Sequence, residues 1–136
     1  MTYFFAFLGS AAIAVSFRMP LRAIPAAGLA GVLGWLGYHG FTVLFGASPM
    51  LSAFVGALLV GIAGELFARK LREPTTMFIV PGLFPLVPGL MAYSGMLFLA
   101  REEMVAASQM LTRAAFYAGA LAAGLALPPA IMRRRQ

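Results

Sequence analysis

Five apolar stretches, separated by short polar or charged connections, run along the chain. They cover Thr2–Phe17, Ala26–Gly46, Met50–Ala68, Thr75–Ala100 and Leu111–Met132, and the first is the shortest. About 20 apolar residues in a helix are enough to cross the hydrocarbon core of a bilayer. The pattern therefore predicts an all-α fold, a polytopic transmembrane helical bundle of about five spans, formed by a single domain over residues 1–136.

Rows of small residues mark three of these stretches. The second stretch carries a glycine at every third position, at Gly28, Gly31, Gly34, Gly37 and Gly40. Glycine costs a helix about 1 kcal/mol relative to alanine, so a row of five implies a packing role. In lipid, small residues let helix backbones approach closely. Rows at spacing four follow in the third stretch (Ala53, Ala57, Gly61) and the fifth (Ala115, Gly119, Ala123). We expect these three helices to pack together.

The fourth stretch is interrupted by prolines and glycines, namely Pro81, Gly82, Pro85, Pro88 and Gly89. Proline has no N–H and clashes with the carbonyl four residues earlier, so the carbonyls of Met77, Pro81 and Phe84 are expected to lose their helical partners. Broken backbone at membrane depth must face protein or water. Discontinuous helices of this kind build substrate sites in transporters, and Pro88 is a natural first residue for a second half-helix. The segment is thus either a substrate pathway or a kinked structural helix.

Composition excludes a soluble fold. Hydrophobic residues make up 62% of the chain and charged residues 10%, whereas soluble domains average about 25% charged. The formal charge is +6, but the basic residues occur in short clusters between apolar stretches. This arrangement is typical of membrane anchors and not of a nucleic-acid surface. The lipid bilayer is therefore the first expected partner, and nucleic acid is not expected.

The distribution of Lys and Arg predicts an orientation. The successive connections carry two (residues 18–25), none (47–49), three (69–74) and one (101–110, offset by Glu102 and Glu103), and three more lie at 133–135. Alternation of this kind follows the positive-inside rule. It predicts a multi-pass protein of the cell (inner) membrane, with its N-terminus outside and its C-terminus in the cytoplasm. The segment Met1–Ser16 has no positive residue ahead of its apolar run, so we expect a retained span and not a signal peptide.

A family resemblance starts at the broken stretch. The Pro-Leu-Val-Pro-Gly of residues 85–89, followed by Tyr93, resembles the C-terminal half of the threonine/serine exporter family. The basic segment Arg18–Arg22, the Gly-Tyr-His-Gly of residues 37–40 and the Val-Gly-Ile-Ala-Gly of residues 60–64 fit the same family. The resemblance covers nearly the whole chain and implies the small subunit of the split, two-component type, working with a larger membrane subunit. It implies export of threonine and serine, or of succinate-like dicarboxylates, and leaves a homo-oligomer open.

Two polar residues inside the spans are candidates for ion coupling. Glu65 shares a spacing-four row with Gly61 and should face other helices, and intramembrane carboxylates are functional candidates by default. The alternative is a simple pair with Arg69, four residues on. His39 lies within the glycine row and titrates near neutral pH. Its alternative is a neutral side chain that hydrogen-bonds across helices.

Two further residues are candidates for substrate contact. Arg113 begins the fifth stretch and is placed to attract a carboxylate at the outer mouth, or else it only snorkels to the interface. Tyr93 follows the proline motif and is placed to donate a hydrogen bond to a substrate, or else it is an interfacial or packing residue.

Catalysis is not expected. The chain has no Asp, Asn or Cys, four Glu and one His. This set excludes an aspartyl protease, makes a zinc site improbable, and predicts neither a metal nor a cofactor. No Gly-x-x-x-x-Gly-Lys-Ser/Thr phosphate loop is present. The alternative to transport is a non-transporting scaffold or assembly subunit of a larger complex, for which a broken helix brings no advantage.

Overall fold

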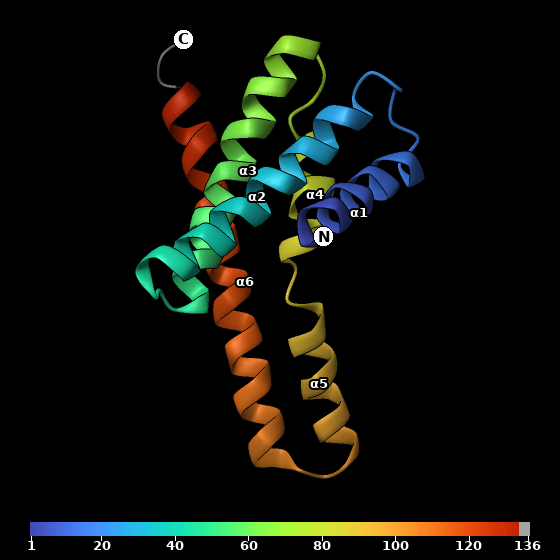
Figure 1. The fold of residues 1–136 in the computed structure, drawn as a ribbon. Coiled ribbons are helices and arrows are strands. Elements are labelled where there is room, and N and C mark those ends of the chain that lie inside the picture. Colours follow the sequence, from blue (N-terminus) through green and yellow to red (C-terminus); the bar gives the residue numbers. More distant parts are fainter. Residues whose placement is uncertain (134–136) are drawn as a thin grey trace.

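The protein is built of helices. A computed structural model describes residues 1–133, with side chains to Met132, and contains no strand within that range. The elements are α1 (Thr2–Ser16), α2 (Ile24–Phe45), α3 (Pro49–Leu71), α4 (Thr76–Leu83), the short 3₁₀ helix η1 (Phe84–Leu86), α5 (Gly89–Ala100) and α6 (Met104–Arg133). Figure 1 shows their arrangement. The predicted all-α class is confirmed.

Three helices, α2, α3 and α6, are long and apolar enough to cross a membrane. The segment from α4 through η1, together with α5, adds a fourth span if the bent pair is counted as one. The chain is thus a multi-pass membrane protein. α1 is the exception to the prediction, because its 15 residues reach only about 22 Å at a rise of about 1.5 Å per residue. The hydrocarbon core is about 30 Å thick, so the expected first span is a short apolar helix.

Helix ends differ from the ends of the apolar stretches. α3 continues past Ala68 through Arg69 and Lys70, and α6 begins at Met104, well before Leu111. Backbone hydrogen bonding carries a helix into polar residues, because hydropathy reports which residues suit lipid and not where the helix stops. α2 does end as its sequence suggests, with Gly46 in the left-handed conformation at φ 57°.

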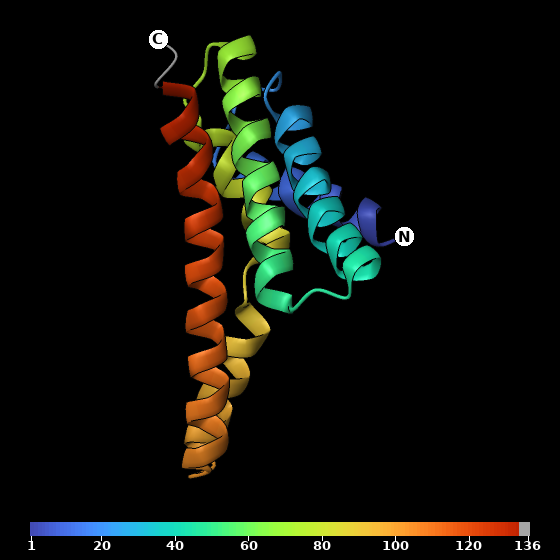
Figure 2. The ribbon, with the colours of Figure 1, turned by 90° about the vertical axis from the view of Figure 1, so that its left-hand side faces the viewer.

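The molecule has a basic end and an elongated opposite end. The α1–α2 connection, the α3–α4 connection and the end of α6 lie together at the top of Figure 1, whereas α5 and the first half of α6 project downward as a hairpin. Figure 2 shows the same hairpin extending beyond the α2–α3 connection. Within the described residues, α6 is the only element on which α5 packs. We use "basic end" for the end that carries Arg18, Arg22, Arg69, Lys70 and Arg72.

The glycine row of α2 is a packing surface, as predicted, at four of its five positions. A Cβ atom at Gly28 would lie 2.5 Å from the Phe7 ring on α1, and one at Gly37 would lie 2.5 Å from Leu59 on α3. Gly31 meets Ser10, and Gly34 meets Val60 and Leu86. Gly40 has no such neighbour within 4 Å. The row therefore lets α2 approach α1 with one end and α3 with the other.

The two remaining rows have opposite outcomes. Ala53, Ala57 and Gly61 on α3 are buried, as predicted. The row expected on α6 is wrong, since its three residues Ala115, Gly119 and Ala123 are all exposed. α6 instead packs through a face that combines large and small residues, namely Tyr117, Leu121, Gly124 and Pro128. A Cβ at Gly124 would lie 2.5 Å from the Phe54 carbonyl oxygen, so a single glycine provides the close approach between α6 and α3.

Candidate functional site

The fourth apolar stretch is broken between α4 and α5. α4 ends at Leu83, one 3₁₀ turn follows, and Val87 is extended with φ −62° and ψ 131°. The helical axes before and after this break differ by 56°. The break is therefore confirmed, and it lies at Phe84–Pro88. Pro81 does not contribute to it, because it is accommodated inside α4.

Tighter turns provide hydrogen-bond donors to two of the carbonyls that have no helical partner because of the prolines. In a straight helix, Pro81 O and Phe84 O would accept from the nitrogens of Pro85 and Pro88, which carry no hydrogen. Here the Phe84 N–H donates to Pro81 O, and the Val87 N–H donates to Phe84 O over 3.4 Å. The backbone thus satisfies itself through i+3 bonds, as is common at helix ends.

The start of α5 leaves backbone donors free. The Gly89 N–H donates to Val87 O at 2.8 Å, and the Ala92 N–H donates to Pro88 O at 3.1 Å. The amides of Leu90 and Met91 have no backbone acceptor among the described residues. Pro88 is the N-cap and not the first helical residue, so the second half-helix starts one position later than predicted. A helix N-terminus of this kind carries partial positive charge.

A groove of about 350 Å³ follows the break. It is lined by Trp35, Tyr38, Pro85, Leu86, Val87, Pro88, Gly89, Leu90, Met91 and Tyr117. Trp35 and Tyr38 come from α2 with ring centroids 5.8 Å apart, and Tyr117 on α6 lies 6.4 Å from Tyr38. A cavity of this size, mostly apolar with a few convergent donors, suits a small ligand. We call it the break groove.

Trp35 separates the break groove from a second cavity of about 230 Å³ on the α1 side. The second cavity is lined by Thr2, Phe5, Ala6, Gly9, Trp35, Phe84 and Pro85. Trp35 and Pro85 line both cavities. The Trp35 Nε1 atom is buried and has no hydrogen-bond partner in the described structure. Buried N–H groups normally have one, so this donor is available to a ligand.

The predicted residues of the proline segment divide into two groups. Pro85, Pro88 and Gly89 line the break groove. Pro81 and Gly82 are buried within α4, where a Cβ at Gly82 would lie 2.9 Å from Val60 and 3.2 Å from Ala30. These two residues therefore pack α4 onto α2 and α3 and do not reach the groove.

The other predicted residues lie outside the groove. Tyr93 is 64% exposed on α5. His39 is exposed and stacks on Trp35, with ring centroids 6.3 Å apart and planes 6° from parallel. Arg113 lies with Ser108, Gln109 and Thr112 along a shallow, exposed part of α6.

Glu65 is half-buried on α3, and the alternative interpretation, a pair with Arg69, is not seen. The Arg69 guanidinium donates to the backbone carbonyl of Met132, 3.4 Å away at the end of α6. The described residues contain no ion pair between Glu65 and Arg69. The structure therefore does not show Glu65 as the ion-pair partner of Arg69.

The aromatic side of the groove was not predicted from the sequence, because Trp35, Tyr38 and Tyr117 were not among the candidate site residues. The available signal was the spacing of Trp35 and Tyr38, which places them about one turn apart beside the glycine row. Nearby, the Thr42 hydroxyl lies 2.7 Å from Tyr38 O and 2.8 Å from Ser52 Oγ. Since Thr42 has one proton to donate, the buried Ser52 must donate to it, which ties α2 to α3 below the groove.

Comparisons with known proteins agree on one family. The family model described as "Threonine/Serine exporter, ThrE" matches residues 2–131. A curated relative named "Threonine/serine exporter", from Corynebacterium glutamicum, is 32% identical over 125 residues, which are 92% of this chain and 25% of the relative. The chain thus spans about a quarter of that relative's length. No solved structure matches. Within the described residues, no group of three or more His, Cys, Asp or Glu is placed to hold a metal ion.

Proposed function

Because this chain belongs to the threonine/serine exporter family, a family of membrane transporters, we propose that it is one subunit of a secondary transporter. The proposed substrates are small metabolites that carry a carboxylate, either threonine and serine or succinate-like dicarboxylates. The subunit works with a larger partner subunit that supplies the rest of the membrane domain.

The break groove carries this proposal. The free amides of Leu90 and Met91 open the first turn of α5, and both residues line the groove. A helix N-terminus stabilises a nearby anion by roughly 0.3 to 2 kcal/mol. All of the proposed substrates carry a carboxylate. It would bind at this helix start, because the amides of Leu90 and Met91 that would donate to it have no backbone acceptor.

Three aromatic side chains complete the proposed site. The Trp35 indole N–H is a buried donor without a partner, and Tyr38 on α2 and Tyr117 on α6 line the same groove. The rings supply an apolar wall for the short carbon chain of the substrate. Since Trp35 also borders the cavity on the α1 side, its rotation would connect the two cavities and open a path past the break.

The larger partner is proposed to cover the α5–α6 hairpin. Leu90, Tyr93 and Met96 on α5 are 81%, 64% and 65% exposed, and only Gly95 of this helix is buried. The break groove opens beside the same hairpin, so a partner seated there would close the groove. The matched segment is 25% of the curated relative, and the proposed partner supplies the counterpart of the rest. A second copy of the chain is the competing occupant.

Orientation and coupling are also proposals. The basic end is placed on the cytoplasmic side of the inner membrane, with the N-terminus outside, because positive residues favour that side. Arg113, toward the other end of α6, then lies near the outer mouth. His39, stacked on Trp35, and Glu65 are the proposed coupling residues.

A transport assay in vesicles tests the function. Vesicles with this chain alone, and with the chain and its candidate partner, are compared for threonine, serine and small dicarboxylates. Trp35→Phe keeps an aromatic ring but removes the N–H, and Tyr3→Phe removes the hydroxyl of an α1 residue that lines neither cavity, as the control. We expect Trp35→Phe to raise the KM about tenfold, the equivalent of one hydrogen bond to a charged group at about 1.5 kcal/mol, and Tyr3→Phe to have no effect.

Two results would contradict the proposal. Equal KM values for Trp35→Phe and Tyr3→Phe would exclude the groove as the substrate site. Transport that stays the same when this chain is omitted would leave it as a scaffold or assembly subunit.

A further inference from the structure

Two adjacent cavities lie at the basic end, away from the break groove. The first, of about 230 Å³, is lined by Pro20, Arg22, Ala23, Lys70, Leu71 and Glu73, and we call it the basic cavity. The second, of about 240 Å³, is lined by Phe17, Met19, Thr76, Met77, Val80 and Pro81, and we call it the apolar cavity. Both lie between the α1–α2 connection and the segment that leads from the end of α3 into α4.

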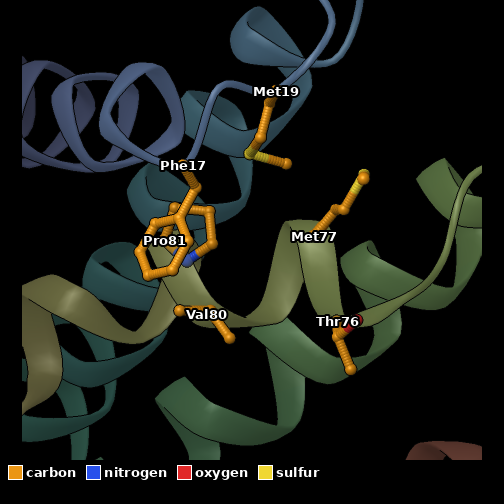
Figure 3. Close-up of a pocket in the computed structure, with 6 residues that line it drawn as sticks. All are labelled: Phe17, Met19, Thr76, Met77, Val80 and Pro81. Carbon is orange, nitrogen blue, oxygen red and sulfur yellow. The ribbon is translucent and has the colours of Figure 1, made fainter.

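The two cavities share one wall. Met19 and Ala23 belong to a single buried cluster, and Leu71 and Met77 pack against it. Met19 and Met77 line the apolar cavity, while Ala23 and Leu71 line the basic one. Figure 3 shows Phe17 and Met19 reaching the apolar cavity from the α1–α2 connection, opposite the α4 residues. α4 leads from the basic end into the bundle (Figure 1), and only the apolar cavity of the two is lined by α4 residues.

The charges of this region are strongly biased. Five of the seven Lys and Arg residues whose side chains are described lie at the basic end. Two of them line the basic cavity, Arg22 from the α1–α2 connection and Lys70 from the last turn of α3. Glu73 is a carboxylate on the same cavity and opposes anion binding. The two cations outnumber it, and three more arginines, Arg18, Arg69 and Arg72, belong to the same end of the molecule.

The α1–α2 connection also presents apolar side chains beside its arginines. Leu21 is 85% exposed and Phe17 is 66% exposed. Such side chains next to Arg22 suit the membrane interface, where arginine reaches lipid phosphates and the apolar groups reach the acyl region. A lipid at the membrane interface is therefore placed to contact both cavities.

We propose that the paired cavities bind one anionic phospholipid. The phosphate of its headgroup lies between Arg22 and Lys70, and the upper part of one acyl chain enters the apolar cavity against Met77 and Val80. Basic pockets between membrane helices recognise anionic headgroups through this chemistry. The bound lipid would join the α1–α2 connection to the start of α4, and so would hold the first half of the broken helix in place.

Lipid retention by the purified chain tests the proposal. Native mass spectrometry counts the lipids kept from micelles that contain phosphatidylglycerol or phosphatidylcholine. The double variant Arg22→Gln/Lys70→Gln is compared with Arg101→Gln/Arg113→Gln, which removes the same charge elsewhere. We expect the wild type and the control to prefer phosphatidylglycerol about tenfold or more, as two cations near a headgroup imply. The Arg22→Gln/Lys70→Gln variant should lose this preference.

A second variant and two soluble probes separate a lipid from a free anion. Val80→Trp changes no charge and fills the apolar cavity from an exposed position, so it should weaken phosphatidylglycerol retention while thermal unfolding stays cooperative. Inorganic phosphate and glycerol phosphate should raise the unfolding midpoint far less than phosphatidylglycerol does. Three results would overturn the proposal. The wild type could retain phosphatidylglycerol and phosphatidylcholine equally, or the Arg101→Gln/Arg113→Gln control could lose the preference as fully as Arg22→Gln/Lys70→Gln does. The third is that inorganic phosphate raises the unfolding midpoint as much as phosphatidylglycerol does.

Discussion

A pair of glycines in the same row of α2 allows the packing role of that row to be measured. Gly34 is buried, and a Cβ there would lie 2.9 Å from Leu86 Cδ1, 3.6 Å from the Gly56 carbonyl oxygen and closer still to Val60. Gly40 lies two positions further along the row and has no neighbour within 4 Å of the same hypothetical atom. Substitutions at the two positions have the same intrinsic helix propensity and differ only in what the new side chain meets.

The expected magnitudes follow from these distances. Forcing extra atoms into a packed core costs about 1 to 3 kcal/mol, and replacing glycine by alanine in a helix returns at most about 1 kcal/mol. Gly34→Ala should therefore destabilise the protein by roughly 0 to 2 kcal/mol. Gly34→Leu should cost more than about 3 kcal/mol, because its further carbons need space that Val60 and Leu86 already occupy. Gly40→Ala and Gly40→Leu should stay within about 1 kcal/mol of the wild type.

Unfolding in detergent micelles, followed by circular dichroism together with size-exclusion chromatography, measures these differences. Equal midpoints for Gly34→Leu and Gly40→Leu would refute the reasoning, since they would mean that α2 and α3 do not approach as closely as the structure places them. A lower midpoint for Gly40→Leu alone would reverse the assignment and place the packed face at the other end of the helix.

Three further predictions concern the break, the half-buried carboxylate of Glu65 and the topology. Pro85→Ala/Pro88→Ala restores two N–H donors, so the variant should gain helicity by circular dichroism. It should also lose about tenfold or more in substrate affinity, because the free amides at the start of α5 become paired. Unchanged affinity would show that the break does not bind substrate. Glu65→Gln should uncouple transport from the driving gradient without moving the unfolding midpoint, and normal coupled transport would assign Glu65 a structural role. Single cysteines at Ser48 and Glu73 should label from opposite faces of the membrane, and labelling from one face would contradict the proposed orientation.

Hydropathy and small-residue spacing predicted which segments are helical and that α2 and α3 pack closely. They did not predict which face of α6 is buried. In lipid, the surroundings of a helix are as apolar as its protein neighbours, so apolar residues at helical spacing do not distinguish the two sides. Tyr117 is buried on α6 while the small residue Gly119 is exposed. Tyr117 packs in one buried cluster with Ala53 and Ala57 of α3, so the small residues of this contact are on α3 and the large one is on α6.

The proline motif predicted that the helix breaks, yet it did not predict what faces the break. The backbone consequence of Pro85 and Pro88 is local, since each removes one donor from a known carbonyl. The groove depends instead on Trp35 and Tyr117, which are far from the motif in sequence and reach it only through the packing of α2 and α6. Tyr93 was a candidate for substrate contact because it follows the proline motif in sequence, but the helix axes bend by 56° at the break and Tyr93 does not line the groove.

The glycine row and the broken helix are two parts of one arrangement. Leu86, in the turn between α4 and α5, is 2% exposed, and its two methyl groups would lie 2.9 Å and 2.5 Å from Cβ atoms placed at Gly34 and Gly56. A Cβ at Gly56 would also lie 2.8 Å from the Gly34 carbonyl oxygen, which cannot rotate away. The missing side chains therefore form the seat that Leu86 fills. This seat fixes the turn between α4 and α5, so the position of the break groove depends on Gly34 and Gly56, although neither lines the groove. A side chain at either glycine would move the turn, and the groove with it, without contacting a ligand.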